Sequence, residues 1–504
     1  MSFTRRSFLV GAGSGLSLLL LTACTTPEPV PTPSSSPVPT TAVPAPSAFR
    51  RSNWSTDPFA RGSHSFATVG TGPETRETLA TPLLDRVFFA GEATSLEHPG
   101  TVIGARESGV RAANEVSVAS EDGEKIAVIG AGAAGAEAAR LLALYGYDVV
   151  MIDARERTGG RIHSIASDDW ATTVELGAWR FAQSADSDIL TTLDELGVST
   201  ALVGQPTLVS ATATAPGGST GGDSTEGDSA ESDPNGADSL VPDNTVGTTA
   251  LASALSWAAT QASDVSLQDA LDESGATEGA SGSSIGELAG ADLLGQQLAA
   301  VAASYGAAAS DLSSWYGFTP PAVGLPVIRQ DGTVEAAEPQ YAVTGGLSAL
   351  IDDSLDGVET FLSTTVVGVA YSDDGVSLRL GTGESLSVDR VVVTVPIGVL
   401  QSNDLAFDPL LPFAHRTAIA EVGVGTVDTI WLQFDEPFWT SDAAVWNIVG
   451  GAGDIVTWYN LMPIMGEPIL VGVYGGAAAL RLAELSDDEL VETALANLEP
   501  FLAA

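Results

Sequence analysis

The chain has 504 residues, 44% of them hydrophobic, which is long enough for two domains with substantial cores. Its 64 acidic residues against 20 Lys and Arg give a formal net charge of −44, which excludes a general basic surface for nucleic acid or anionic lipid. The single cysteine, Cys24, excludes an intramolecular disulfide and a cysteine-based metal site, and the four scattered histidines form no metal motif.

The first 24 residues have the pattern of an export signal. Arg5 and Arg6 precede Ser-Phe-Leu and an apolar stretch that ends near Leu21 and is short for a membrane span. The twin arginines resemble a Tat signal, and Leu-Thr-Ala-Cys resembles a bacterial lipoprotein cleavage box that would place a lipid on Cys24. We expect an exported lipoprotein that faces outside the cytoplasm and contacts the cell membrane only through its lipid. An uncleaved N-terminal anchor is the alternative.

Two segments are too poor in large apolar residues to fold on their own. Residues 25–46 are rich in Pro, Ser and Thr, which predicts a semi-extended linker. Residues 211–244 consist largely of Gly, Ser, Thr, Asp and Glu, and we interpret them as a disordered acidic insertion, because they bury too little surface to offset the entropy of ordering.

The stretch from Lys125 to Asp153 predicts a dinucleotide-binding unit. A short apolar run is followed by Gly130, Gly132 and Gly135, then by an Ala- and Leu-rich segment of helical period, then by a second apolar run. Gly130 permits a tight turn, Gly132 lets a pyrophosphate approach the backbone, and Gly135 lets the helix and the sheet pack closely. Asp153 ends the second strand, where it is placed to accept hydrogen bonds from a ribose.

The continuation of this stretch, Arg155-Glu-Arg157-Thr-Gly159-Gly160-Arg161, resembles the extended FAD signature of the flavin amine oxidase family. Other landmarks of that family are Phe88 to Thr94, His98 to Ala113, Val174 to Phe181 and Val391 to Leu400. The resemblance covers nearly all of Pro46 to Ala504 apart from the insertion. It implies FAD, held by Gly130, Gly132, Ala134, Gly135, Asp153, Arg155, Gly160, Arg161, Gly177, Ala178, Val366, Gly91, Glu92, Thr101 and Val102.

The order of these landmarks is unusual, because those that end a family member come before the glycine turn here. We interpret this as a circular permutation joined through Ser117 to Glu124, with a gene-model artefact as the alternative. The expected fold is α/β, with a Rossmann-like FAD-binding domain and a second, α+β substrate domain. Residues 1–24 are the expected signal, 25–46 the linker and 47–116 the permuted C-terminal segment, which contributes to the FAD and substrate sites. The FAD-binding domain consists of the Rossmann segment 124–183 and its continuation 321–403. The substrate domain consists of 184–320, which includes the insertion, and its continuation 404–504.

Five residues are candidates for contact with the substrate or the reacting atoms. Where family members commonly carry a lysine near the flavin, this chain has Thr429, and its one lysine, Lys125, lies at the start of the first Rossmann strand. The two histidines His64 and His98 are candidate substrate contacts, with ordinary packed or surface positions as the alternative.

The remaining two candidates, Trp179 and Arg180, resemble the amino acid oxidase branch of the family, in which an arginine at this place binds the substrate carboxylate. Pairing of Arg180 with an acidic residue or a flavin phosphate is the alternative, and His98 to Ala105 is closer to the amine and polyamine branch.

The resemblance implies an FAD-dependent oxidase of a primary or secondary amine, or of an L-amino acid, with oxygen as the acceptor and hydrogen peroxide as a product. Non-covalent FAD is expected, because the only thiol lies in the signal. The alternatives are a flavin dehydrogenase or desaturase with another acceptor and a non-catalytic flavin-fold lipoprotein. The expected partners are a small-molecule amine or amino acid and oxygen, with no nucleic acid.

Overall fold

The computed structural model describes residues 41–182, 189–211, 244–451 and 453–502, and residues from Thr41 onward form one unit. The predicted signal, most of the linker and nearly all of the acidic insertion lie outside the described residues. No helix in the described part of the chain is long and apolar enough to span a membrane.

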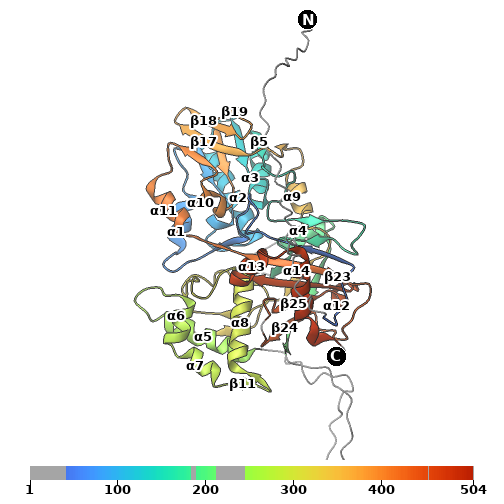
Figure 1. The fold of residues 1–504 in the computed structure, drawn as a ribbon. Coiled ribbons are helices and arrows are strands. Elements are labelled where there is room, and N and C mark those ends of the chain that lie inside the picture. The colour runs from blue at the N-terminus through green and yellow to red at the C-terminus, as the bar shows by residue number, and fades with distance from the viewer. Residues whose placement is uncertain (1–40, 183–188, 212–243, 452, 503–504) are drawn as a thin grey trace, which may run out of the picture. The chain divides into compact units, whose positions relative to one another are not determined.

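A five-stranded parallel sheet forms the half of the unit at the top of Figure 1. Its central strands are fully buried runs of β-branched and other apolar residues, as parallel sheets require. Its strand order is β16 (Glu359–Phe361), β5 (Asp148–Ile152), β4 (Lys125–Ile129), β20 (Arg390–Val393) and β3 (Val87–Phe89).

Side chains alternate between the two faces of this sheet, so each face has a core of its own. Ile126 and Val128 of β4 face helices α2 (Val102–Ala119), α3 (Ala133–Leu144) and α9 (Ala349–Ser354). Ala127 and Ile129 face a second layer. That layer consists of β19 (Ser385–Val388), β18 (Gly375–Leu380), β17 (Val366–Ser372), β21 (Ala406–Asp408), α1 (Pro73–Ala80), α10 (Ile397–Ser402) and α11 (Phe413–Glu421).

The other half is built on a six-stranded mixed sheet. Its order is β1 (Ala48–Arg51), β23 (Val427–Gln433), β26 (Ile469–Gly475), β25 (Thr457–Asn460), β24 (Val445–Val449) and β10 (Pro206–Ser210). Trp446 and Trp458 face one core with α13 (Gly476–Ala483), α14 (Asp487–Asn497) and η3 (Glu499–Phe501). Trp431 and Tyr459 face the opposite side, toward Trp179.

Smaller elements complete this half and connect it to the parallel sheet. A three-stranded antiparallel sheet has the order β8 (Arg180–Ala182), β15 (Gln340–Val343), β9 (Thr200–Val203). The two-stranded pairs are β2 (His64–Phe66) with β22 (Gly423–Gly425), β6 (Ser164–Ile165) with β7 (Val174–Glu175), and β13 (Val327–Ile328) with β14 (Val334–Glu335). Short helices are η1 (Glu92–Thr94), α4 (Ile189–Glu195) and α12 (Met462–Met465).

A group of helices, α5 (Thr245–Ala258), α6 (Leu267–Glu273), α7 (Ala276–Ser281) and α8 (Gly290–Tyr305), packs around its own apolar core. The sequence pattern predicts one helix from Ile285 to Tyr305, and the first part of this prediction is wrong. β11 (Ser284–Ile285) and β12 (Leu288–Ala289) form a hairpin instead, with Gly286 at φ +56°. The helix begins at Gly290, where a Cβ would lie 1.9 Å from Ala280 O.

Candidate active site

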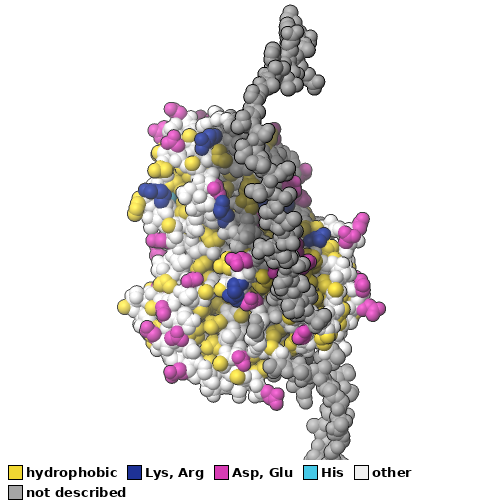
Figure 2. All heavy atoms as spheres, viewed as in Figure 1, with side chains coloured by type: hydrophobic (Ala, Val, Ile, Leu, Met, Phe, Trp, Pro, Cys, Tyr) yellow, Lys and Arg dark blue, Asp and Glu magenta, His cyan; other side chains and the backbone are white. Residues whose placement is uncertain are grey.

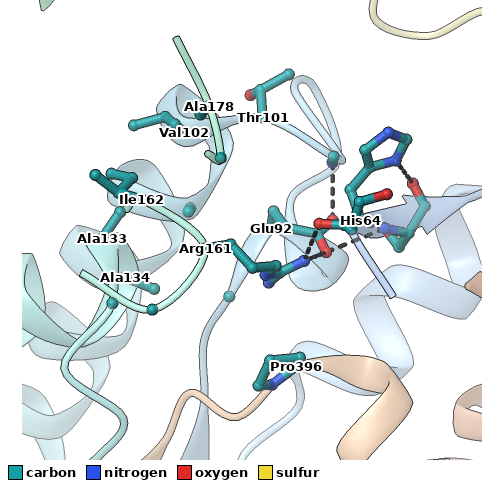
Figure 3. A pocket seen from close by; sticks show the side chains of 18 of the residues that line it. His64, Glu92, Thr101, Val102, Ala133, Ala134, Arg161, Ile162, Ala178 and Pro396 are labelled. Atoms are coloured by element: carbon teal, nitrogen blue, oxygen red, sulfur yellow. Dashed lines mark hydrogen bonds and ion pairs between the residues drawn. The ribbon is translucent and has the colours of Figure 1, made fainter. Parts of the chain in front are cut away.

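A cavity of about 730 Å³ runs between the two halves of the unit. One end is lined by the turn between β4 and α3 and by the start of β17. The other end is lined by Trp179, Thr429, Tyr305 and Val473. Figure 3 shows Arg161, Glu92 and the start of α3 around this space. The cavity therefore joins the predicted dinucleotide site to the predicted substrate site.

The glycine turn has the geometry that its spacing predicts. Gly130 has φ +106°, which other residues rarely adopt, and a Cβ at Gly135 would lie 1.9 Å from Gly130 O. A Cβ at Gly132 would meet nothing nearer than Gly159 O at 3.8 Å. Gly132 therefore faces open space in the cavity, at the N-terminus of α3.

Asp153 lies at the end of β5 and is buried beneath the turn. Its Oδ2 accepts from Ala131 N at 2.7 Å and its Oδ1 from Arg155 N at 2.7 Å. A carboxylate has further lone pairs, so Asp153 can still accept from a ribose. Arg155, predicted to contact the cofactor, forms a bidentate ion pair with Asp57, in which Nη1 donates to Oδ2 at 2.7 Å and Nη2 donates to Oδ1 at 2.8 Å. Its charge is therefore balanced by the protein itself.

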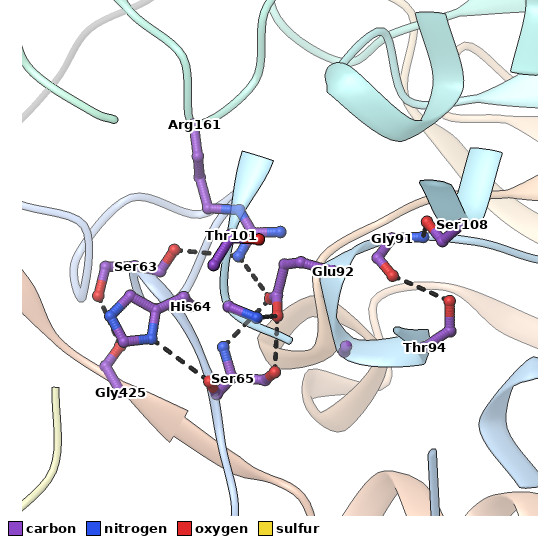
Figure 4. A network of polar contacts seen from close by, with 12 residues as sticks. Ser63, His64, Ser65, Gly91, Glu92, Thr94, Thr101, Ser108, Arg161 and Gly425 are labelled. Atoms are coloured by element: carbon purple, nitrogen blue, oxygen red, sulfur yellow. Dashed lines mark hydrogen bonds and ion pairs between the residues drawn. The ribbon is translucent and has the colours of Figure 1, made fainter. Parts of the chain in front are cut away.

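Glu92 lies at the centre of a buried polar network (Figure 4). Its carboxylate accepts from Arg161 Nη1 at 2.8 Å, Ser65 N at 3.1 Å, Ser65 Oγ at 2.6 Å and Gly100 N at 2.8 Å. Arg76, itself only 5% exposed, donates to Ser65 Oγ at 2.9 Å. The network fixes Arg161 at the cavity wall with its guanidinium paired to a carboxylate.

The ionisation of Glu92 depends on these partners. Burial alone raises the pKa of a carboxyl group, but Arg161, the Ser65 hydroxyl and Arg76 outweigh it and lower the pKa of Glu92 to about 2. Glu92 is therefore ionised at neutral pH.

Helix α2 points its N-terminus into the cavity. Thr101 caps it by accepting from Gly104 N at 3.0 Å, and Thr101 and Val102 both line the cavity. The partial positive charge at this end of the helix favours an anionic group in front of it. Gly91, at φ +128°, reaches the same wall and is held by Ser108 Oγ at 2.8 Å.

The substrate end combines aromatic rings with an arginine. Trp179 packs edge-on against Trp431 and Tyr459, with ring centroids 5.5 and 5.1 Å apart. The Arg180 guanidinium lies 5.3 Å from the Trp179 ring and 4.6 Å from the Tyr459 ring, and it donates to the Tyr459 hydroxyl. None of the ion pairs among the described residues includes Arg180. Its positive charge is therefore available to an anion in the cavity.

Thr429 lies on β23 with its side chain in the cavity wall. The residue is 5% exposed, and its hydroxyl is buried without a hydrogen-bond partner. Such an atom needs a partner from a ligand or a water molecule. Lys125 lies elsewhere, at the start of β4, with Nζ 3.9 Å from Asp148. The structure therefore agrees with the prediction that Lys125 cannot replace a lysine at Thr429.

The two histidines differ. Burial lowers the pKa of His64, so its imidazole is neutral at neutral pH, and its Nδ1 lies 3.3 Å from Ser65 O. His98 also lines the cavity, but its Nδ1 lies 2.9 Å from Glu107 Oε2. A carboxylate already occupies that face of His98, so His64 is the better placed of the two to contact a substrate.

The structure brings the predicted site residues together. Every predicted cofactor, substrate or catalytic residue lines the cavity except Gly135, which packs beneath the turn, and Cys24, which lies outside the described residues. The sequence reasoning missed Arg76, Tyr459, Tyr305 and Glu338. Arg76 and Tyr459 contact the site through residues more than ten positions away, and no local motif marks them.

These features define a class of protein: a flavoprotein fold with a Rossmann-type nucleotide site and an adjoining apolar substrate chamber. The sequence profile of the family described as flavin containing amine oxidoreductase matches residues 36–117 and 133–504. The chain belongs to this family, whose description names a flavin.

Similar proteins carry related names. Polyamine oxidase 4 of Oryza sativa subsp. japonica is 32% identical over 161 residues, which is 32% of this chain and 33% of that protein. Lysine-specific histone demethylase 2 of Homo sapiens is 28% identical over 163 residues, 31% of this chain and 20% of that protein. The matched region thus spans a third or less of these two relatives.

Two solved structures share the fold. A double mutant of putrescine oxidase has a TM-score of 0.54 at 20% identity, covering 76% of this chain and 82% of that one. Cyclohexylamine oxidase from Brevibacterium oxydans has a TM-score of 0.52 at 20% identity, covering 74% of this chain and 79% of that one.

The residues present fit FAD. The open space at Gly132 and the N-terminus of α3 suit a pyrophosphate, the N-terminus of α2 suits the flavin ring, and Asp153 suits a ribose. The predicted adenine contact, Val366, lines the same cavity at the start of β17. Close packing of Gly177 on Arg161 O, 1.8 Å from where its Cβ would be, holds Ala178 at the wall.

The first prediction concerns Gly132→Val. The side chain would enter open space, so we expect the variant to fold, but its methyl groups would occupy the path of the pyrophosphate and abolish FAD binding. Flavin absorbance per mole of purified protein measures this. Gly295→Val, at an exposed glycine of α8 with open space around it, is the matched control and should keep its flavin. Stoichiometric flavin in Gly132→Val would contradict the assigned pyrophosphate site.

The second prediction concerns Glu92→Gln. Because the folded pKa of about 2 lies below the ordinary value of 4.5, ionised Glu92 stabilises the fold above about pH 4.5, and this contribution is lost as the pH falls through 2. We expect the variant to lose about 3 kcal/mol of unfolding free energy at neutral pH and about half of that or less at about pH 3. Urea unfolding at both pH values tests this. A deficit that does not change with pH would show that the network is not stabilised by the charge of Glu92.

Proposed function

We propose that the chain is an FAD-dependent oxidase of a primary or secondary amine, with the amino group of an L-amino acid as the preferred case. The products are the imine and, with oxygen as the acceptor, hydrogen peroxide. The observation that carries this proposal is the continuous cavity from the Gly132 turn to Arg180 and Thr429. The predicted nucleotide site and the substrate chamber share one cavity.

When bound, FAD would supply the oxidising chemistry by accepting a hydride, which is two electrons and one proton, from the carbon that bears the amino group, while the nitrogen loses a proton to give the imine. The protein supplies orientation and the exclusion of water. Trp179 and the apolar residues around it surround the substrate end and lower the local dielectric, which strengthens each polar contact there. Neutral His64 adds no charge to this chamber, and the unpaired hydroxyl of Thr429 is available to hold a water molecule or a polar substrate atom.

Arg180 supports the amino acid as the preferred substrate. A guanidinium without a carboxylate partner, held in place by two aromatic rings, matches the planar carboxylate of an amino acid. A simple amine would leave this half-buried charge without an anion. The acidic partner that would make Arg180 purely structural is absent from the ion pairs of the described residues.

Thr429 supports a second candidate. In the family resemblance a lysine at this place lies near the flavin, and its replacement by a neutral hydroxyl removes a positive charge from the site. A flavin dehydrogenase that uses another electron acceptor would not need that charge. Peroxide release in air, compared with dye reduction without air, separates the two candidates.

The third prediction uses Arg180→Ala in that assay. Loss of a charge-assisted contact of about 1.5–3 kcal/mol should weaken an amino acid substrate ten- to a hundredfold and leave its decarboxylated amine unaffected. A panel of amino acids and matching amines, followed by peroxide detection, measures the effect. If the wild-type enzyme oxidises amines and ignores every amino acid offered, Arg180 does not bind a substrate carboxylate.

We also propose that the chain order is a circular permutation of the family order. Three observations support it. Strand β3 pairs with β20 in the parallel sheet, and β1 pairs with β23 in the six-stranded sheet, although both early strands precede the glycine turn. Val43, near the first described residue, and Phe501, near the last, belong to the same core cluster. Residues 120–124 directly connect α2 to β4. A peptide from the native protein that spans this join would exclude a gene-model artefact, and its absence from full peptide coverage would support one.

We further propose export as a lipoprotein through the Tat pathway. The fourth prediction follows: Cys24→Ala should remove the protein from the lipid-modified fraction, and Arg5→Lys with Arg6→Lys should retain it in the cytoplasm. Detergent partitioning and cell fractionation measure the two effects. Wild-type fractionation of both variants would refute the proposed anchor.

A further inference from the structure

A second, small pocket of about 30 Å³ lies beside the main cavity, behind Arg180. Arg180, Ala303, Ser304, Val323, Leu325 and Val473 line both spaces. The strands β24 and β25 close the far side with Asn447, Thr457 and Tyr459. Arg180 therefore stands between the substrate chamber and a small polar annex.

Gln340 faces Arg180 across this annex. The two residues lie on adjacent antiparallel strands, where Arg180 pairs with Ala342 and Gln340 pairs with Ala182. Because side chains two positions apart on a strand point to the same face, Arg180 and Gln340 form a diagonal cross-strand pair. Such neighbours are typically about 7–8 Å apart, which is within reach of long side chains. Gln340 is 4% exposed, and Gly324 packs on its amide so closely that a Cβ there would lie 2.9 Å from Nε2.

Both side chains have a buried polar atom without a partner. Arg180 Nε is a donor and Gln340 Oε1 is an acceptor, and neither has a hydrogen bond within the protein. A volume of 30 Å³ is enough for one water molecule, which needs about 10–15 Å³ and two to four polar partners. A water molecule can accept from Nε and donate to Oε1, and this satisfies both atoms.

We infer that the annex is a water site that connects Arg180 to Gln340, and that Gln340 is a positioning residue that determines specificity for an anionic substrate group. The water directs Nε away from the chamber, and Tyr459 accepts from Nη1, so that the remaining guanidinium donors face the substrate. Because the Gln340 amide is neutral, it orients Arg180 without cancelling its charge. This inference rests on the proposed carboxylate contact of Arg180.

Gln340→Glu and Gln340→Met separate orientation from charge. Glutamate keeps the shape of the glutamine side chain but gives Arg180 a counter-ion within the protein. We therefore expect the carboxylate probe benzoate to bind the Gln340→Glu holoenzyme at least tenfold more weakly than the wild type. Methionine removes the acceptor and should weaken binding about threefold. Gln330→Glu makes the same charge change on an exposed loop, where Gln330 donates to Trp315 O at 2.8 Å, and should bind benzoate as the wild type does. Flavin absorbance during benzoate titration gives the affinities.

Steady-state kinetics distinguish positioning from a general structural role. Gln340→Glu should raise KM for an amino acid while leaving KM and kcat for its decarboxylated amine unchanged. Equal losses for both substrates, or benzoate affinity unchanged in Gln340→Glu, would overturn the role of Gln340.

A high-resolution crystal structure of the holoenzyme tests the water directly. Density within hydrogen-bond distance of Arg180 Nε and Gln340 Oε1 is expected, and a dry annex would overturn the water site. If the wild-type protein binds no benzoate while the annex holds its water, the carboxylate contact and the specificity role fail and only the water site stands.

Discussion

The ion pair between Arg161 and Glu92 is the interaction on which the site depends. It joins the glycine-rich turn after β5 to the segment that contains η1, and Ser63, Ser65 and Arg76 bring the β2 region into the same network. Arg155 and Asp57 make a second link, from the same turn to the segment between β1 and β2. Because both links are partly or fully buried, separating the segments would expose unpaired charges, which is strongly unfavourable. The walls of the cavity are thus fixed relative to each other by charge as well as by apolar packing.

Charge is distributed very unevenly in this protein. The net charge is −44, and Figure 2 shows acidic side chains scattered over the visible face. Four of the twenty basic residues, Arg76, Arg155, Arg161 and Arg180, nevertheless line the cavity. Three of them are close to Glu92 or Asp57, and Arg180 is not. An acidic exterior keeps the protein soluble, while the arginines remain where an anionic cofactor or substrate group needs them.

Much of this site was predictable because its residues occur in local patterns. The glycine turn and Asp153 belong to a motif with a fixed spacing between its strand, turn, helix and second strand, so the spacing places them, and Thr101 was indicated by the family resemblance. Arg76, Tyr459 and Gln340 act through contacts between distant segments, which no periodicity records. The hairpin at Ile285 was missed because its apolar residues fit a helical period equally well, and only the tight turn at Gly286 separates the two interpretations. The acidic insertion and the signal, predicted from composition, lie outside the described residues.

The strand order of the parallel sheet also bears on how the chain folds. Helix α2, β4, α3 and β5 follow one another closely in the sequence, and α2 packs directly on α3, so this layer needs only local contacts and should form early. Strand β3, by contrast, pairs with β20 and not with β4. β20 lies between β4 and β3 in the sheet and follows β3 by some 300 residues in the sequence. During synthesis one edge of β4 therefore stays unpaired until β20 has been made. We expect misfolding and aggregation to begin at that exposed edge.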